Sequence, residues 1–291
     1  MALDADLVVD RLADQFVVKL GNEFAPQRAF SLEVMPGSPG RVTEAGGRGK
    51  IQVEVSKDAS AVQTDSVDYQ TNVGSDNTNA AITMAEYSVS WVITSNEQLE
   101  GERFATGPGR NAQALSDTIW GKVTTLLQAS TFTNTVADVT EANFTDANRE
   151  ALWASVNAGT EPLHLVLDRT ALSSMLPSDK NSFQLSTEGA YGFAGIHSQT
   201  LWTGAESDEV YGFACTPQAF VVHHGIPDRP AAVRDAIANS GRIETLEIPG
   251  GLDVEFCVWT DTETRSLFAS LALCYGVAVA DATALTMQRT P

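Results

Sequence analysis

The hydrophobic pattern is clearest between residues 107 and 130, where apolar side chains recur every three or four positions. This spacing places them on one face of a helix. Pro108 and Gly109 break the preceding segment, and Asn111 is suited to cap the first turn. The pattern therefore predicts an amphipathic helix over residues 111–129, about 27–30 Å long at 1.5 Å per residue, packed on a sheet. The apolar positions are Ala112, Leu115, Ile119, Val123 and Leu126.

The chain before this helix begins with a second helical pattern and continues into an irregular segment. Residues 3–20 have apolar positions at helical spacing, and Gly21 and Asn22 end the pattern. Residues 26–49 are rich in proline and glycine and contain few large apolar side chains. We expect residues 1–48 to form a short helix and an extended arm that gains order by lying on another surface.

Two segments with alternating apolar and polar residues follow the arm. They are residues 50–56 and 80–93, and they flank the polar stretch 57–79. Alternation is typical of half-buried strands, and so long a connection is uncommon inside a compact domain. We therefore expect a projecting β-hairpin over residues 49–90. An isolated hairpin is marginally stable in water, so this one needs a partner surface.

Beyond the long helix, helical and strand patterns are interleaved, which indicates the α+β class with long antiparallel strands. Residues 178–209 are read as loops because glycines are scattered through them. The predicted helices are 147–157, 169–176, 218–222 and 231–238. The predicted strands are 130–139, 163–167, 210–214, 252–260, 266–279 and 284–289.

Composition and charge exclude several classes of protein. The chain has 18 basic and 37 acidic residues and a net charge of −19, whereas proteins that bind nucleic acid through its phosphates carry clustered Lys and Arg. No apolar run reaches the roughly 20 residues of a membrane helix. Acidic residues interrupt the N-terminal apolar positions, unlike a signal peptide, so we expect synthesis in the cytoplasm. The three cysteines form no C-x-x-C pair and are interpreted as buried thiols.

The short motifs that suggest chemistry lack the context that they require. Residues 107–112 match G-x-G-x-x-A, but the preceding segment is too polar for a Rossmann strand. In residues 46–50 a P-loop is excluded, because Glu44 stands where its first glycine belongs. His223 and His224 are adjacent and point apart in regular structure, so a metal site with Asp228 is disfavoured. We predict neither enzymatic activity nor a bound cofactor or metal.

Four stretches resemble segments of tailed-phage major capsid proteins with the Hong Kong 97-like fold. Residues 90–101, SWVITSNEQLEG, are similar to the strand that leaves the extended loop of that fold. Residues 151–157 with 165–167 resemble the start of its apical domain. Residues 212–220, GFACTPQAF, resemble a strand-to-helix turn in that domain, and residues 273–279, LCYGVAV, resemble the closing strand.

This resemblance implies a division of the chain into four parts. These are an N-terminal helix and arm (1–48), an extended β-hairpin loop (49–90), a peripheral domain (91–145 and 276–291) whose long spine helix spans 111–129, and a mixed apical, or axial, domain (146–275).

The resemblance also implies a structural role. The chain would assemble with itself into hexamers and pentamers of an icosahedral phage head. The head would enclose double-stranded DNA, held by proximity rather than by specific binding. A separate scaffolding protein, a portal protein and a decoration protein are further possible partners, and no membrane is involved. The protein would be made in the cytoplasm of a bacterial host and reside in the virion.

Two alternatives share parts of this interpretation. One is an encapsulin-type nanocompartment shell, and the other is a different virion structural protein such as a tail-tube subunit. In each case subunits must contact one another, and the apolar side of the hairpin and two tryptophans are the candidates. The proposed inter-subunit residues are Ile51, Val53, Val55, Ile82, Met84, Trp91 and Trp120.

Overall fold

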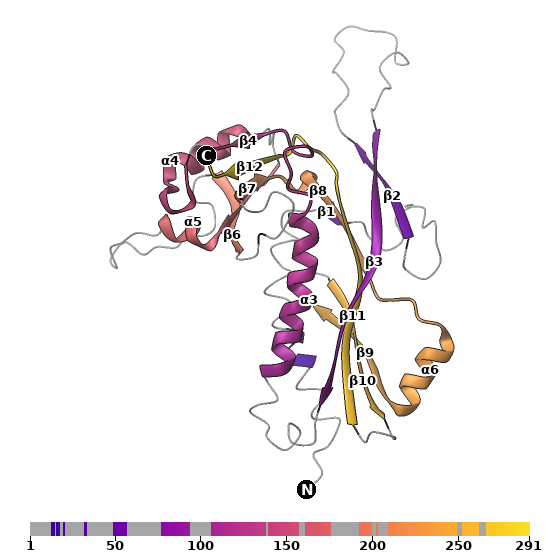
Figure 1. Cartoon of the computed structure of the whole chain (residues 1–291). Coiled ribbons are helices and arrows are strands. Elements are labelled where there is room, and N and C mark those ends of the chain that lie inside the picture. Colours follow the sequence, from indigo (N-terminus) through magenta and orange to yellow (C-terminus); the bar gives the residue numbers. More distant parts are fainter. Residues whose placement is uncertain are drawn as a thin grey trace, which may run out of the picture.

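The structure is a computed structural model in which two β-sheets are joined by one long helix, α3 (Figure 1). It describes residues 13–14, 16–17, 20, 32–33, 49–56, 77–93, 106–137, 139–156, 161–175, 192–199, 202, 209–248, 252–261 and 266–291. Most of the predicted N-terminal helix and arm, and the polar stretch after residue 56, lie outside these residues.

The larger sheet has seven strands and contains the predicted hairpin. Its strands run in the order β1-β8-β11-β10-β9, with β3 paired to the free side of β11 and β2 paired to β3. Because β2 and β3 pair in antiparallel register from Gly49–Met84 to Ser56–Asn77, the hairpin is confirmed. The strands are β1 Leu32–Glu33, β2 Gly49–Ser56, β3 Asn77–Ile93, β8 Phe220–Gly225, β9 Gly241–Ile248, β10 Leu252–Asp261 and β11 Ser266–Val279.

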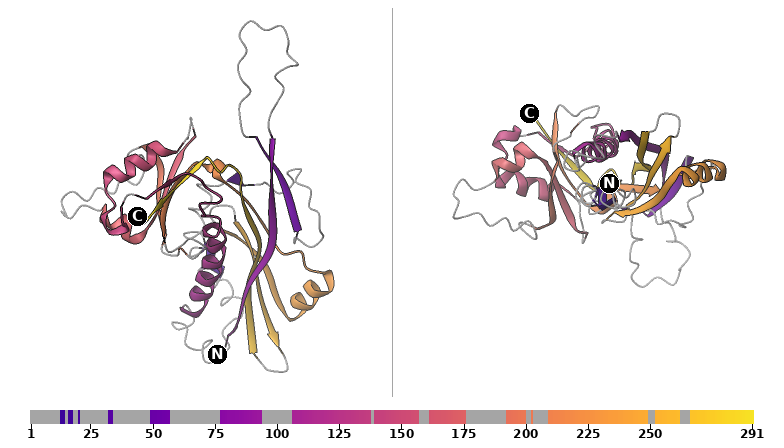
Figure 2. Two further views of the ribbon diagram at one scale, coloured as in Figure 1. Left: turned by 45° about the horizontal axis from the view of Figure 1, so that its top comes forward. Right: turned by 90° about the horizontal axis from the view of Figure 1, so that it is seen from below.

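The smaller sheet has five strands in the order β4-β12-β7-β5-β6. Its central strands are buried on both faces of the sheet. Helices α4 (Asp146–Ser155) and α5 (Arg169–Ser174) pack on one of the two faces. Figure 2 shows the two sheets set apart, with α3 between them. The strands are β4 Thr135–Val136, β5 Leu163–Asp168, β6 Phe193–Gln199, β7 Val210–Cys215 and β12 Leu285–Arg289.

Helix α3 spans Thr106–Thr124, so the predicted helix exists but both of its predicted ends are wrong. Pro108 lies in its first turn, where a missing N–H costs nothing because the first four helical N–H groups have no partner in the helix. At the other end, the amides of Leu126 and Leu127 bond three residues back, to Val123 and Thr124. The chain therefore tightens there and leaves the α-helix before residue 129.

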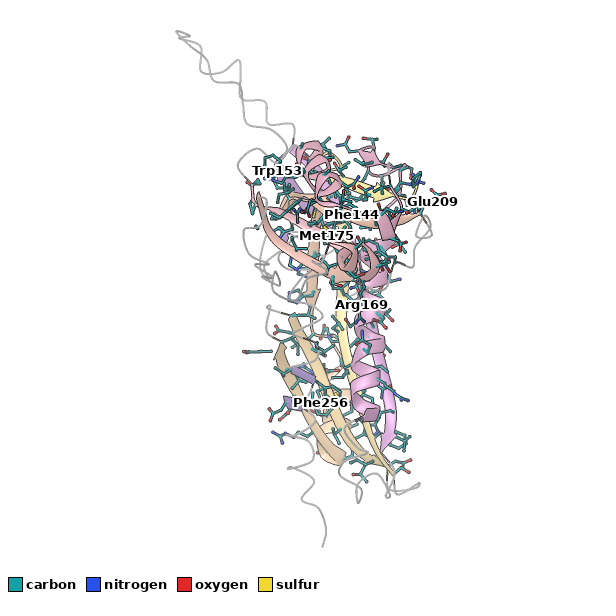
Figure 3. All side chains as sticks on the ribbon, turned by 90° about the vertical axis from the view of Figure 1, so that its left-hand side faces the viewer. Phe144, Trp153, Arg169, Met175, Glu209 and Phe256 are labelled. Carbon is teal, nitrogen blue, oxygen red and sulfur yellow. The ribbon has the colours of Figure 1, made fainter. Side chains whose placement is uncertain are left out.

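The two halves of α3 belong to two different hydrophobic cores. Its first half contributes Ala112, Leu115 and Ile119 to the core against the seven-stranded sheet. Its second half places Trp120 and Val123 in the core of the five-stranded sheet. The helix thus fixes one sheet relative to the other. In Figure 3 the label of Phe256 marks the first core, at the lower end of the molecule.

The described part of the N-terminal helix packs into the core of the seven-stranded sheet. Residues 13, 14, 16, 17 and 20 are helical. Phe16 and Leu20 are fully buried, and the Phe16 ring lies 5.7 Å from Trp91 and 5.4 Å from Phe256 between centroids. This segment therefore covers the same face of the sheet as α3.

Several predicted elements of the second half need correction. The predicted helix 218–222 is a single turn over Pro217–Ala219 followed by strand β8, because the Phe220–Val222 side chains favour a strand. The predicted strand 130–139 is reduced to β4, with only two residues. Strands β6 and β9 were not predicted. The helix predicted at 231–238 is confirmed as α6, Ala231–Ser240.

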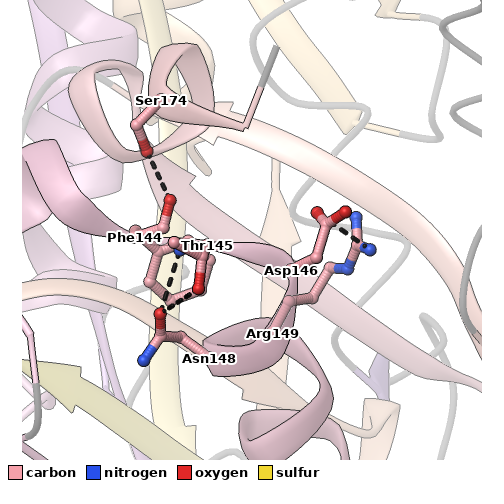
Figure 4. A network of polar contacts seen from close by, with 6 residues as sticks. All are labelled: Phe144, Thr145, Asp146, Asn148, Arg149 and Ser174. Atoms are coloured by element: carbon pink, nitrogen blue, oxygen red, sulfur yellow. Dashed lines mark hydrogen bonds and ion pairs between the residues drawn. The ribbon is translucent and has the colours of Figure 1, made fainter. Parts of the chain in front are cut away.

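Side-chain hydrogen bonds fix the start of α4 (Figure 4). Both the amide and the hydroxyl of Thr145 donate to the Asn148 side-chain oxygen, at 3.0 and 2.6 Å. The Ser174 hydroxyl, at the end of α5, donates to the Phe144 carbonyl at 2.7 Å, and Arg149 pairs with Asp146. These contacts tie α4 and α5 together on one face of the five-stranded sheet.

The sheets group the strands differently from the domain boundaries expected from the sequence. Residues 220–261 and 266–275 were assigned to the apical domain, yet β8, β9, β10 and β11 all lie in the seven-stranded sheet with β3. Residues 285–289 form β12 of the five-stranded sheet. The chain crosses from one sheet to the other three times: through α3 between β3 and β4, at β7–β8 and at β11–β12. A linear pattern does not show the last two exchanges.

The hairpin strand β3 crosses β11 at a point where only glycine fits. A Cβ atom at Gly276 would lie 2.5 Å from the Cγ2 of Ile82 and 2.8 Å from the Thr83 carbonyl oxygen. Ile82 is fully buried and packs with Met84. The base of the hairpin is therefore held by close backbone approach as well as by hydrogen bonds.

We expect Gly276→Ala to lower the free energy of unfolding by about 1–3 kcal/mol, because β3 must shift to admit the methyl group. Gly225→Ala is the matched control, since a Cβ atom there meets nothing within 4 Å. Urea unfolding followed by tryptophan fluorescence measures both variants. Equal stabilities of the two variants would contradict the close approach.

Candidate assembly surfaces

The described residues offer surfaces rather than a metal centre as candidate sites. Among them, no three His, Cys, Asp or Glu side chains lie close enough together to hold a metal ion. No helix in this part of the chain is both long and apolar enough to cross a membrane. The features that could contact another macromolecule are the hairpin and the exposed apolar side chains.

The hairpin projects from the rest of the molecule. Within the described residues β2 pairs only with β3, and Figures 1 and 2 show β2 and its partner end of β3 at the margin of the seven-stranded sheet, to one side of the five-stranded sheet. Ile51, Val53 and Val55 lie on β2, and the register pairs Ile51 with Ile82 and Val53 with Ala80. A long hairpin in this position can reach a neighbouring molecule without moving the sheets.

Four of the residues predicted to meet a neighbour have partners within the subunit itself. Ile82, Met84 and Trp120 are buried, and Trp120 packs edge-on against Trp202 with 6.3 Å between centroids. Trp91 is partly buried against Phe16. Their role between subunits stays a prediction. Exposed side chains are the better candidates for contacts with a neighbouring subunit.

An apolar row crosses the outer face of the seven-stranded sheet, the face opposite α3. It consists of Val92 on β3, Phe268 on β11 and Trp259 on β10, which are direct neighbours in the strand register. The Trp259 and Phe268 rings stack at 5.6 Å between centroids with 14° between their planes. Val92 is 44% exposed. We call these three residues the outer-face row.

Sequence reasoning missed the outer-face row because it depends on strand register. Each of its members occupies an alternating position in its own strand, but nothing in the sequence shows that the three strands are aligned. One signal was present: Trp259 and Phe268 lie in predicted strands on either side of a short polar turn, and such flanking strands pair in a hairpin.

A buried ion cluster holds the segment before α6 on the same outer face. The Arg229 guanidinium donates to Glu255 at 2.6 Å and lies 3.3 Å from Glu86. Glu86 and Glu255 flank β11 on either side, opposite Cys274 and Ala272. These two small residues leave room for the guanidinium across the strand. The Glu255 side chain is 1% exposed, and Arg229 is the cation beside it.

Trp153 is a further exposed aromatic residue, on α4 of the five-stranded sheet's domain (Figure 3). It is 48% exposed, and the rest of its indole packs against Gly192. Gly192 has φ of +84°, which favours glycine, and a Cβ atom there would lie 2.7 Å from the Trp153 Nε1. The indole is therefore positioned by the glycine, with its other side open.

Comparison with known proteins gives no match by sequence: neither a family model nor a curated protein matches this chain.

Comparison with solved structures finds the same fold in proteins that form particles. The virus-like particle from Pyrococcus furiosus matches with a TM-score of 0.56 and 10% identity, over 96% of this chain and 98% of that one. The capsid of the cyanophage P-SCSP1u gives 0.50 and 10% identity, over 91% and 88%. The capsid of the native GTA particle gives 0.50 and 10%, over 92% and 90%.

At this identity the likeness shows the fold. The chain has the α+β fold of these capsid subunits, and the Hong Kong 97-like fold predicted from the sequence is confirmed.

We expect Arg229→Met to lower the free energy of unfolding by about 3–5 kcal/mol, because it leaves the Glu255 carboxylate buried without its cation. Adding Glu255→Gln should recover part of this loss. Arg242→Met is the control: Arg242 is 42% exposed in its pair with Glu244, and an exposed pair contributes less than about 1 kcal/mol. Equal losses in denaturant titrations of Arg229→Met and Arg242→Met would contradict this role.

Proposed function

We propose that this chain is the subunit of a closed protein shell, the major capsid protein of a tailed bacteriophage. The observation that carries the proposal is the match over nearly the whole of both chains with the capsid of the cyanophage P-SCSP1u, 91% of this chain and 88% of that one. The whole subunit, rather than one shared domain, has the fold of a particle-forming protein. A likeness in a single domain would support a much weaker proposal.

The projecting hairpin supports self-assembly. Its base is anchored by the crossing at Gly276, while β2 has no second strand partner within the described residues. An exposed strand edge is a surface for pairing with another chain. In the proposed shell of hexamers and pentamers, the hairpin of each subunit lies on its neighbour, and repetition of this head-to-tail contact closes a ring.

The charge of the chain supports a wall that encloses DNA without binding it tightly. With 18 basic and 37 acidic residues, the inner surface of such a shell would repel the phosphate backbone overall. Packaged double-stranded DNA would then be retained by enclosure. A scaffolding, portal or decoration protein would complete the proposed virion.

The alternative is an encapsulin-type shell with a protein cargo. The Pyrococcus furiosus particle, described as virus-like, has a higher TM-score than either of the two capsids. This match supports the encapsulin-type shell as the second candidate. The contents of purified particles distinguish the two: nuclease-protected DNA is expected for a phage head, and a co-purifying protein without DNA for a nanocompartment.

We further propose that the outer-face row contacts a second copy of the chain. It is apolar and partly exposed, and no charged residue belongs to it. In a chain with a net charge of −19, two copies repel one another unless they meet at uncharged surfaces. Stacked aromatic rings are typical of the central part of protein interfaces.

Replacing residues 53–80 with Asn-Gly tests the hairpin. The two residues form a tight turn between Gln52 and Ala81, which are already paired. We expect a folded subunit that forms no particles, as measured by light scattering and size-exclusion chromatography beside the parent chain. Particles of the parent size would contradict the proposed role of the hairpin and leave the shell proposal standing.

Val92→Glu tests the outer-face row, with Val233→Glu on α6 as its matched control. The two valines are 44% and 42% exposed, so each change should alter the stability of the subunit by less than about 0.5 kcal/mol. We expect Val92→Glu to lower particle yield at least tenfold and Val233→Glu to leave it unchanged. Equal yields from both variants would contradict the proposed contact.

A further inference from the structure

Two histidines form a pair within the five-stranded sheet. His164 lies on β5 and His197 on β6, and the register places His164 beside Gly195 and His197 beside Val166. Both side chains therefore point to the same face. The His197 Nε2 lies 3.5 Å from the His164 Nδ1. The rings stack with 5.7 Å between centroids and 24° between their planes.

The pair is buried on one side only. His164 is 8% exposed, and His197 is half-buried. A Cβ atom at Gly195 would lie 3.0 Å from the His197 Nε2 and 3.2 Å from the His164 Nδ1, so the backbone passes directly beside the contact. A side chain larger than glycine at position 195 would therefore press on both rings.

The contact depends on protonation. A hydrogen bond between two imidazoles needs one nitrogen with a proton and one without. Two neutral rings satisfy this, but two imidazolium rings present N–H groups to each other and two positive charges at short distance. Burial lowers the pKa of His164, and burial together with the charge of His164 lowers the pKa of His197 to about 4. Both rings are therefore neutral at pH 7.

The titratable groups on the pair's face of the strands beside it are Asp168 on β5 and Cys215 on β7. On this face of β5 the next titratable group is Asp168, at the far end of the strand, where it accepts from the Thr170 amide at 2.6 Å to cap α5. On β7 the group opposite His164 is Cys215, whose pKa is raised by burial. The same core as Val166 contains the apolar side chains of Trp120 and Val123 from α3 and of Leu127 just beyond it.

Strand β6 is the last strand of its sheet. It pairs in parallel with β5, and within the described residues it has no second strand partner. An edge strand can leave its sheet without disturbing the strands beyond its neighbour. Separation of β6 from β5 is a movement that relieves repulsion between the rings and leaves β7, β12 and β4 paired.

We propose that the His164–His197 pair is an acid-sensitive contact that releases strand β6 from the five-stranded sheet when both rings are protonated. This inference rests on the sheet itself and is independent of the proposed shell. The step is proton uptake alone, one proton at each imidazole, with loss of the N–H···N hydrogen bond.

The direction of the pH effect follows from linkage. A histidine in the open form has its ordinary pKa of about 6.5, while the paired form of His197 has one of about 4. Above pH 6.5 both forms are neutral, and the contact has its full strength. As the pH falls from 6.5 to 4, the open form binds more protons than the paired form. The equilibrium constant for opening therefore rises by up to about tenfold per pH unit for each histidine.

Hydrogen exchange of the full-length protein tests the proposal between pH 7.5 and 4, with EDTA present to exclude metal bridging. After correction for the intrinsic exchange rate, we expect opening of the segment containing residues 193–199 to increase by about 80-fold from pH 6.5 to 4 through the titration of His197 alone. In His197→Gln, which cannot titrate, the increase should fall at least tenfold. His223→Gln, on β8, is the control and should behave like the parent.

A direct titration by NMR of the four histidines gives a second measurement that needs no variant to fold. We expect His197 to remain neutral well below pH 6, and the pKa of His164 to be lower than that of an exposed histidine. Opening of β6 that does not vary with pH, or ordinary titration near 6.5 of all four rings while β6 stays protected, would overturn the proposal.

Discussion

The fold depends on the burial of two stretches of one helix in two separate cores. The first half of α3 packs on the seven-stranded sheet and the second half on the five-stranded sheet. Trp120 stands where the two halves meet and contacts Trp202. Because α3 belongs to both cores, the sheets are fixed in relation to each other, and the surfaces that they present outward keep a constant spacing. That property suits a subunit that repeats in a lattice.

Strand β3 has a related double role. Its residues 85–93 pair with β11 in the sheet, and its residues 77–84 pair with β2 in the hairpin. The hairpin is thus a continuation of a core strand and is anchored by the core. On the outer face, Arg229 holds the segment before α6 across β11. The outer-face row lies on this same face and remains partly exposed.

Local patterns predicted much of this arrangement. Periodicity identified α3, and alternation identified the hairpin strands, β10 and β11, because each signal lies within one element. The ends of α3 were mispredicted since Pro108 is tolerated in a first turn. Strand β6 was missed because glycines at 192 and 195 suggest a loop, whereas Gly192 supports Trp153 and Gly195 lies beside the histidine pair.

The candidate surfaces were harder to predict than the elements. Buried Ile82, Met84 and Trp120 look the same in a sequence as residues that face a neighbour, because both are apolar. The outer-face row and the Arg229 cluster each combine residues from three separate segments. Only strand register brings such residues together, and register over long separations is set by the tertiary fold rather than by local sequence. The order of the elements, rather than any one motif, indicated the capsid fold.

Electron microscopy of the chain expressed alone tests the central claim most directly. The account predicts closed particles of uniform diameter, or capsomer rings that close when a scaffolding partner is supplied. A stable 31 kDa monomer that stays monodisperse at high concentration, with or without such a partner, would contradict it.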